Sequence, residues 1–146
     1  MPMADAPAHH APAPHAQART DRIERAAIRA INRQRWRYGL PTLHVSNRLS
    51  AIATWHSWDM VRHGMLSHSS SDGTPFYTRI RRIVPARSVG ETLIEFRGSY
   101  GGKAIVRAWM NSAPHRAELL SRRYHRVGVG RWRQRGMTIV TADFAS

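Results

Sequence analysis

The pattern of hydrophobic and polar residues predicts that the first half of the chain is helical. Apolar residues between positions 23 and 34 recur every three or four residues, and Asp21 with Glu24 can form a capping box before them. A second helix is expected over 47–63, where Ser46 precedes an amphipathic stretch that ends at a glycine. Each helix would bury one apolar face.

Shorter helices alternate with strands in the second half of the chain. The expected elements are a helix that starts at Pro75 and is capped by Thr74, a strand over 90–96, helices over 103–111 and 114–120, and strands over 127–133 and 137–144. The last two strands are joined around Arg135-Gly136, which is typical of a hairpin turn. Because helices come first and antiparallel strands last, with one strand between, the order predicts the α+β class.

Length and apolar content indicate one folded domain. The chain has 146 residues, of which 42% are hydrophobic, and this suits a single globular core. Residues 1–20 are rich in Ala, Pro and His, so we expect a flexible arm with solvated histidines before a domain over 21–146. No apolar run is as long as a membrane span, and residues 1–20 hold no signal-peptide hydrophobic segment. We expect a soluble protein, made without a signal peptide or with one already removed.

Basic residues outnumber acidic residues strongly. There are 23 Lys and Arg against 9 Asp and Glu, a formal net charge of +14, and every cation except Lys103 is an arginine. Such a field favours anionic partners such as nucleic acid, phospholipid headgroups or wall polymers. The alternative, which we rank above a dedicated polyanion site, is an arginine-rich composition with most of these side chains solvated. The absence of cysteine excludes disulfides, thiolate catalysis and Cys-ligated zinc.

Three short motifs carry side chains suited to a site. His68 lies in a serine-rich loop, Glu91 follows a glycine at a strand start, and His115 follows a proline at a predicted helix start. Brought together by the fold, they would form a cleft that can hold a proton, a divalent metal or a polar ligand, and two imidazoles with one carboxylate are a common zinc ligand set. The alternative, which the spacing alone favours, is that each residue ties its own loop by a hydrogen bond.

Other polar combinations are weaker candidates. Serines flank His68 and Asp72, but no G-x-S-x-G nucleophile elbow is present, so a serine hydrolase is not expected. His56, Asp59 and His63 share one side of the second helix. His56 is expected to pack, whereas packing and support of a site are equally open for His63. Five tryptophans among many arginines would suit base stacking, yet no nucleic-acid-binding signature is present, and nucleic acid is not the expected partner.

An ordered series of short motifs covers roughly residues 22–145. It consists of Ile31-Asn32-x-x-Arg35, Gly39-Leu40, Leu43, Leu49, Ala53-x-x-His56-Ser57-x-Asp59-Met60, Ser67-His68-x-Ser70-x-Asp72-Gly73, Arg79-Ile80, Gly90-Glu91, Trp109-Met110-x-Ser112-x-x-His115-Arg116, Leu119-Leu120, Gly128-Val129-Gly130 and Asp143-Phe144. Each motif alone is weak, but their order along the chain is specific, and the series resembles the CAP superfamily of SCP-like extracellular proteins, in its bacterial branch.

The resemblance implies an α-β-α sandwich, with a central antiparallel sheet between helical layers and a large open cleft. It places His68, Glu91 and His115 in that cleft as candidate ligands of a divalent metal, zinc first. A second glutamate of eukaryotic members is replaced here by Ser112, and the usual Gly-Glu-Asn carries Thr92 in third place. The expected supporting residues of the cleft are Ser67, Asp72, Thr92, Ser112, Arg116 and His63.

The expected function is binding rather than catalysis, by a secreted or cell-envelope protein whose oligomeric state is left open. The cleft would hold a divalent metal or a small polar or lipid ligand, and the arginines would keep the protein near anionic cell-surface or lipid components. The first alternative is a metal-dependent hydrolase of peptides or esters that uses Glu91 as a ligand or base. The second is a basic protein that binds polyanions or nucleic acid.

Overall fold

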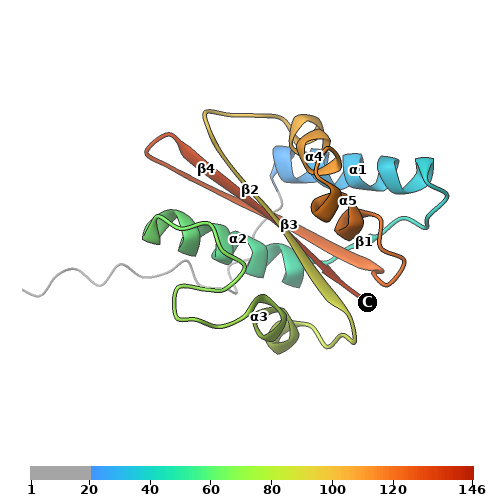
Figure 1. Cartoon of the computed structure of the whole chain (residues 1–146), viewed down its shortest axis with the longest axis horizontal. Coiled ribbons are helices and arrows are strands. Elements are labelled where there is room, and N and C mark those ends of the chain that lie inside the picture. Colours follow the sequence, from blue (N-terminus) through green and yellow to red (C-terminus); the bar gives the residue numbers. More distant parts are fainter. Residues whose placement is uncertain (1–20) are drawn as a thin grey trace, which may run out of the picture.

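The computed structural model, which describes residues 21–146, places a four-stranded sheet between two helical layers (Figure 1). The strand order is β1-β3-β4-β2, and β4 pairs antiparallel with both of its neighbours. The strands are β1 His44–Val45, β2 Val89–Arg97, β3 Arg126–Gln134 and β4 Met137–Ala145. The predicted α+β class and sandwich architecture are confirmed. The predicted arm over residues 1–20, with its three histidines, lies outside the described residues.

Helices cover both faces of the sheet. α4 packs against α1 and α5 in one layer, whereas α2 and α3 form the other, with α2 lying across β3 and β4 (Figure 1). The helices are α1 Arg22–Arg37, α2 Asn47–His63, α3 Phe76–Ile83, α4 Gly102–Met110 and α5 Ala113–Leu119. None of these described helices has the length and hydrophobicity that a membrane crossing requires. Strand β2 contacts α3 as well as α4 and α5, so residues from both layers meet around it.

Two glycines of β3 let α2 lie directly on the sheet. A Cβ atom at Gly128 would collide with the backbone of Ser50, and one at Gly130 would collide with the backbone of Thr54. Ser57 of the same helix also reaches the sheet, because its hydroxyl donates to the Gly130 carbonyl at 3.0 Å. This close packing fixes the orientation of α2 and of the site residues that it carries.

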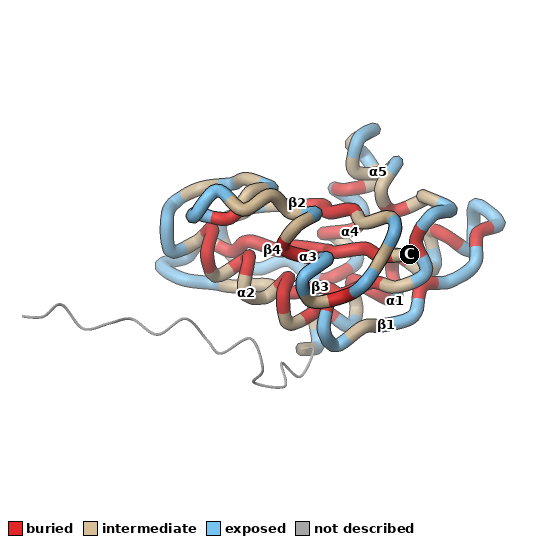
Figure 2. Tube along the Cα trace, turned by 90° about the horizontal axis from the view of Figure 1, so that it is seen from below, coloured by how far each residue is buried: buried red, intermediate tan, exposed pale blue. Residues whose placement is uncertain are grey.

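The hydrophobic core lies on both sides of β4, which is buried over eight of its nine residues (Figure 2). The largest cluster fills the space between the sheet and the α1–α4 layer, and Ile31, Trp109 and Phe144 are among its fully buried members. The Trp109 indole N–H donates to the Leu93 carbonyl at 3.1 Å, so its polar atom is satisfied inside the core. Tryptophan at this position is therefore a packing residue.

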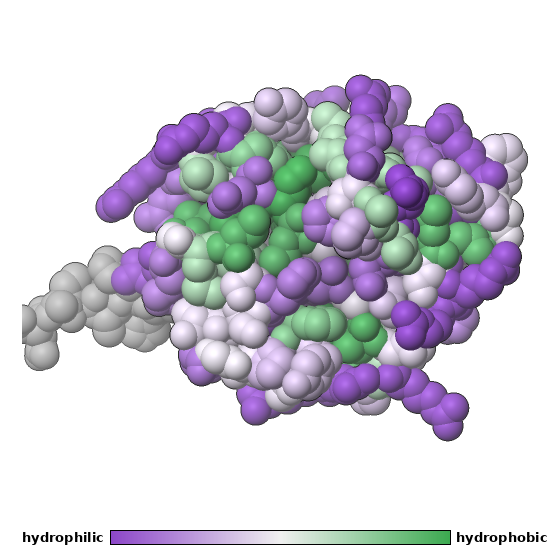
Figure 3. All heavy atoms as spheres, in the orientation of Figure 1, coloured by the Kyte–Doolittle hydropathy of each residue, from purple (hydrophilic) through white to green (hydrophobic). Residues whose placement is uncertain are grey.

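Arginines dominate the surface of α1. All five that the sequence places on the outer faces of this helix are exposed, namely Arg22, Arg25, Arg29, Arg33 and Arg37. Figure 3 shows hydrophilic side chains, in purple, around the rim of the molecule, and a hydrophobic area, in green, between α2 and α4. Most of the charge is thus solvated, with buried exceptions at Arg35 and Arg79.

The predicted helix starts are correct for α1 and α2 and wrong for α3. Asp21 and Glu24 form a reciprocal capping box on α1, and the Ser46 hydroxyl caps α2. The predicted cap at Thr74 is wrong, because Pro75 is the N-cap residue of α3 and makes no side-chain cap. The Thr74 amide is instead bound within the preceding turn, where it donates to a carboxylate two residues earlier. Thr74 therefore belongs to the turn before α3 and not to the helix start.

The short edge strand β1 was not predicted. Two residues are too few to produce an alternating pattern, and the strand exists only through its neighbours. The His44 amide donates to the His125 carbonyl at 2.8 Å, and the Ser46 amide donates to the Val127 carbonyl at 2.9 Å. Because β1 runs parallel to β3, the sheet is mixed rather than wholly antiparallel.

Candidate functional site

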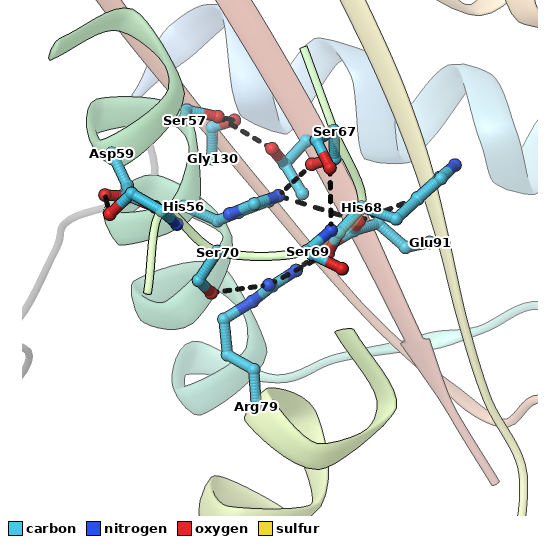
Figure 4. Close-up of polar contacts among 12 residues, drawn as sticks. His56, Ser57, Asp59, Ser67, His68, Ser69, Ser70, Arg79, Glu91 and Gly130 are labelled. Carbon is cyan, nitrogen blue, oxygen red and sulfur yellow. Dashed lines mark hydrogen bonds and ion pairs between the residues drawn. The ribbon is translucent and has the colours of Figure 1, made fainter. Parts of the chain in front are cut away.

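A buried carboxylate on β2 is the centre of the candidate site. The Glu91 side chain is fully buried, and both of its oxygens have partners (Figure 4). Oε2 accepts a hydrogen bond from Arg79 Nη2, and Oε1 lies 2.8 Å from His68 Nδ1. A buried carboxylate is costly unless it is paired and hydrogen-bonded, and Glu91 meets both conditions.

Arg79 of α3 connects the helix, the serine-rich loop and the sheet. In addition to its ion pair with Glu91, its Nη1 donates to the His68 carbonyl at 3.1 Å and to Ser70 Oγ at 2.9 Å. The residue is only 4% exposed, so these bonds are shielded from water. Arg79 therefore fixes the loop backbone at the position where His68 projects from it.

His56 of α2 binds the other side of the same loop. Its Nε2 atom lies 2.8 Å from the Ser67 carbonyl and 3.7 Å from Glu91 Oε1. Burial, and then the nearby Arg79 charge, lower the pKa of His56 to about 3. The ring is thus neutral at ordinary pH, and its Nε2–H donates to the loop. The expectation that His56 packs is compatible with this geometry, but the residue also contacts the site.

A second carboxylate anchors the far end of the loop. Asp59 of α2 accepts hydrogen bonds from the Ser71 amide at 2.8 Å and from the Ser71 hydroxyl at 2.6 Å. His63 Nδ1 lies 2.9 Å from the Asp59 backbone carbonyl and 3.1 Å from Oδ1 of the carboxylate, with its side chain 46% exposed. Asp59 therefore fixes the loop from the α2 side, and His63 contacts Asp59 rather than Glu91.

Asp143 lies directly opposite Glu91 across the β2–β4 pair. The Asp143 side chain is completely buried, and burial followed by the Glu91 charge raises its pKa well above the usual carboxyl range. Two adjacent buried carboxyl groups cannot both ionise, so the pair retains one proton. Burial also raises the pKa of Glu91, to about 7, but Arg79 contacts Glu91 directly and opposes this rise, which favours the negative charge on Glu91 and the proton on Asp143.

His68 and His115 are the accessible members of the site. The His68 side chain is 52% exposed, and because Nδ1 donates to Glu91, its Nε2 lone pair is free. His115 of α5 is half-buried, and the nearby His68 contributes to its altered pKa. Burial is the main cause that lowers the pKa of both rings. Both rings are therefore neutral near pH 7.

The predicted supporting residues are distributed over several places. Ser67 contacts the site through its carbonyl, and Thr92 is buried immediately after Glu91. Asp72 is exposed in the loop turn, where it accepts the bond from the Thr74 amide. Ser112 is the N-cap residue of α5, without a side-chain cap. The remaining member, Arg116, donates to the Met110 carbonyl at 2.9 Å, on the α4 side of α5.

The metal role predicted for the three residues stays a prediction. Among residues 21–146, no three His, Asp, Glu or Cys side chains have the geometry of a metal site. The two oxygens of Glu91 contact Arg79 and His68, and Glu91 thus lies at the Nδ1 side of the His68 ring. In that position a carboxylate orients an imidazole, as is typical for residues that support metal ligands.

Two members of the site, Arg79 and Asp143, were not predicted as functional residues. A signal for Asp143 exists, because it is a carboxylate inside the long apolar strand β4 and such a group needs a partner. Arg79 lies one position before the buried Ile80 in a short amphipathic helix. The sequence does not show whether its long side chain points into the protein or toward solvent. Their pairing with Glu91 depends on tertiary packing.

Comparisons with known proteins agree with this fold. The sequence profile of the CAP family, described as the cysteine-rich secretory protein family, matches residues 28–144. The uncharacterized protein YkwD of Bacillus subtilis (strain 168) is 30% identical over 108 residues, which make up 73% of this chain and 41% of that protein. This chain therefore spans less than half the length of that relative.

Two solved structures show the same arrangement of helices and strands. An extracellular protein containing a SCP domain from Bacillus anthracis has a TM-score of 0.72 and 27% identity, over 86% of this chain and 42% of that chain. An outer surface protein from Borrelia burgdorferi has a TM-score of 0.78 and 19% identity, over 87% of this chain and 94% of that chain. Because the family profile covers most of the described residues and the fold agrees, the chain belongs to the CAP family, although it contains no cysteine.

Proposed function

We propose that this CAP domain acts by binding, outside the cell or in the cell envelope, through an imidazole that Glu91 holds in place. The observation that carries the proposal is the 2.8 Å contact between His68 Nδ1 and Glu91 Oε1. A carboxylate on one ring nitrogen fixes the tautomer and leaves the lone pair of the other nitrogen free. Because the His68 side chain is half-exposed, Nε2 is accessible to a ligand from solvent.

His68 and His115 would be the two imidazoles that hold a divalent ion. Burial is the main cause that lowers the pKa of both rings, which favours the neutral form that metal binding requires. Glu91 would support His68 from behind. Water would complete the coordination, which makes this a weaker site than the three-ligand site predicted from the sequence, and zinc is the first ion to test. The same nitrogens would accept hydrogen bonds from a small polar ligand.

The geometry favours binding over metal-dependent hydrolysis. A general base must reach the water or substrate proton that it removes. Glu91 is buried, and Arg79 and His68 occupy its two oxygens. Asp143 lies one strand further into the sheet and is completely buried. Neither carboxylate is exposed to a substrate in the way that the hydrolase alternative requires.

Thermal unfolding of the metal-stripped full chain, with and without zinc, tests the proposal. Zinc at a hundred times its dissociation constant adds about 2.7 kcal/mol of stability, which raises the unfolding midpoint by several degrees in a chain of this size. His68→Ala is expected to remove this rise, and His115→Ala is expected to reduce it. The matched control is His125→Ala, which removes an exposed imidazole at a position where the backbone makes the hydrogen bonds.

The histidines of residues 1–20 need a control of their own. A full chain in which His9, His10 and His15 are changed to Ala is expected to keep the zinc-dependent rise. A rise that persists in His68→Ala and disappears in this variant would place zinc binding outside the cleft and overturn the metal part of the proposal. Ligand-induced shifts of the His68 ring resonances by NMR, with and without Glu91→Gln, test the polar-ligand part in the same protein.

A further inference from the structure

A basic groove lies between α1 and α4, in the helical layer that does not contain α2 and α3. Its volume is about 480 Å³, and its walls carry Arg33 and Arg37 from α1, Lys103 and Arg107 from α4, and Arg116 from α5. We call this feature the α1–α4 groove. It is separate from the Glu91 carboxylate, because none of the residues that contact Glu91 lines it.

The shape of the groove follows from how the two helices meet. A Cβ atom at Gly102 would collide with the backbone of Ala27, so the start of α4 lies directly against the middle of α1. The groove is lined by residues C-terminal to this contact on both helices. Buried Ala30 and Val106 form its apolar floor, and the cations stand above them.

The charges of the groove are not neutralised from within. None of its lining residues is acidic, and none of its five cations takes part in an ion pair described for residues 21–146. The carboxylates of Glu24 on α1 and Glu118 on α5 are already bound, because Glu24 accepts the backbone amides of Asp21 and Arg131 and Glu118 accepts the Tyr124 hydroxyl at 2.6 Å. The groove therefore has a strongly positive electrostatic potential, and uncharged hydrogen-bond donors also line it.

The cations are arranged in two tiers along the helices. Arg33 and Arg37 are one turn apart, about 6 Å along the axis, and Lys103 and Arg107 repeat the same spacing on the facing helix. Like charges at this spacing destabilise a helix by a few tenths of a kcal/mol per pair. If these cations were only solvated surface residues, there would be no reason for two such pairs to line the same groove. A ligand with several linked anionic groups would contact both pairs.

We propose that the α1–α4 groove binds a linear chain of linked phosphate groups. Guanidinium groups fork onto phosphate oxygens, and a lysine adds a point charge. A ligand with at least two linked phosphates engages both tiers, whereas a single phosphate engages one. A flat membrane surface cannot enter a recess between two helices, so we assign the groove to a free phosphate chain rather than to a lipid headgroup.

Isothermal titration of the full chain with inorganic tripolyphosphate tests this assignment. We expect tripolyphosphate to bind more tightly than orthophosphate, and the affinity to fall as salt is added. The double variant Arg33→Gln/Arg107→Gln removes one guanidinium from each helix and is expected to lower the affinity by about tenfold or more, since each charge-assisted bond is individually strong. Circular dichroism of the variant establishes that it is folded.

The matched control separates the groove from the overall charge of +14. Arg48→Gln/Arg133→Gln removes two exposed arginines at positions outside the groove and lowers the net charge equally. An equal loss of affinity in both doubles would overturn the proposal, as would a preference for anionic vesicles over tripolyphosphate. His68→Ala is expected to bind tripolyphosphate as the unchanged protein does, so failure of the cleft proposal and of the groove proposal can be told apart.

Discussion

The buried cluster around Glu91 and the α1–α4 groove differ in whether their charged side chains are paired within the protein. In the cluster, Arg79 and Glu91 are buried and form an ion pair, and the buried Asp143 lies opposite Glu91 across the β2–β4 pair. In the groove, five cations line one recess without a carboxylate among the lining residues. One region uses its charges for internal structure, and the other leaves them available to a ligand.

Mutations in the buried cluster are therefore expected to affect stability, and mutations in the α1–α4 groove are expected to affect binding. A charge that is shielded from water and paired is strongly coupled to its partner, so removal of either one leaves the other unpaired. A solvated charge near like charges contributes little to stability or opposes it. The predictions below test this division, beginning with the buried cluster.

The largest effect is expected when Arg79 is removed. Arg79→Met keeps the length of the side chain but leaves the Glu91 carboxylate buried without its cation and frees the Ser70 and His68 contacts of the loop. Unfolding in urea should report a loss of about 3–5 kcal/mol. The groove variant Arg107→Met is the control and should change the free energy of unfolding by less than about 0.5 kcal/mol.

A double-mutant cycle strengthens this test. If the cost comes from the unpaired carboxylate, Arg79→Met/Glu91→Gln should be less destabilised than the sum of the two single variants predicts. Additive losses would mean that Arg79 acts by packing alone, and the contrast between the two regions would lose its electrostatic basis.

Acid is expected to destabilise the protein through His56. The pKa of this ring is about 3 in the folded protein, against about 6.5 for an unperturbed histidine. The unfolded chain therefore binds a proton that the folded protein does not, so stability falls as the pH drops from about 6.5 toward 3. Urea unfolding across this range measures the slope.

His56→Gln provides the matched comparison for the acid prediction. Glutamine retains an N–H donor for the Ser67 carbonyl but does not titrate, so the variant should lose less stability between about pH 6 and pH 4 than the unchanged protein. An identical slope in both proteins would assign the acid sensitivity to other groups, of which His68 and His115 also have lowered pKa values.

The elements of the fold that depend on neighbouring residues could be predicted from the sequence. The capping box of Asp21 and Glu24 and the end of α2 at Gly64 each involve residues a few positions apart. The two-residue strand β1 could not be predicted, because its only basis is pairing with a strand far along the chain, in which His44 lies opposite Arg126. The start of α3 was placed wrongly because Pro75, and not Thr74, is its N-cap residue, and Thr74 belongs to the preceding turn.

The candidate site was predictable only in part for the same reason. The local motifs and their resemblance to a family indicated His68, Glu91 and His115, but not how they divide their roles. The division follows from Arg79, which reaches Glu91 from another layer, and from Asp143, which faces it through the register of β2 and β4. Strand register and side-chain direction are properties of the folded protein, so they cannot be predicted from the spacing of residues along the chain.

A smaller effect is expected at Asp143, where an amide can replace a protonated acid. Asp143→Asn keeps a neutral polar group of the same size opposite Glu91 and should change stability at pH 5 by about 1 kcal/mol or less. Because the folded pKa of Asp143 is raised, the folded protein holds a proton that the unfolded chain loses above about pH 4, and this contribution to stability is lost as the pH rises. The variant should therefore show a flatter stability profile than the unchanged protein as the pH rises above about 4. Asp143→Leu, which removes the polar group beside Glu91, should be clearly less stable than Asp143→Asn at pH 5.

The smallest effect is expected in the groove, and it should have the opposite sign. Lys103 is the second residue of α4, where a cation is unfavourable beside the positive end of the helix dipole, and it is one turn from Arg107. Lys103→Glu replaces both unfavourable interactions by favourable ones, so it should raise the free energy of unfolding by about 0.5–1 kcal/mol at low salt. High salt should reduce this gain, because the side chain is exposed. The same substitution should weaken tripolyphosphate binding. Greater stability together with weaker binding would mean that the groove retains a charge that destabilises its own helix, whereas a loss of both would show that Lys103 is needed for the fold and would remove the groove from the comparison.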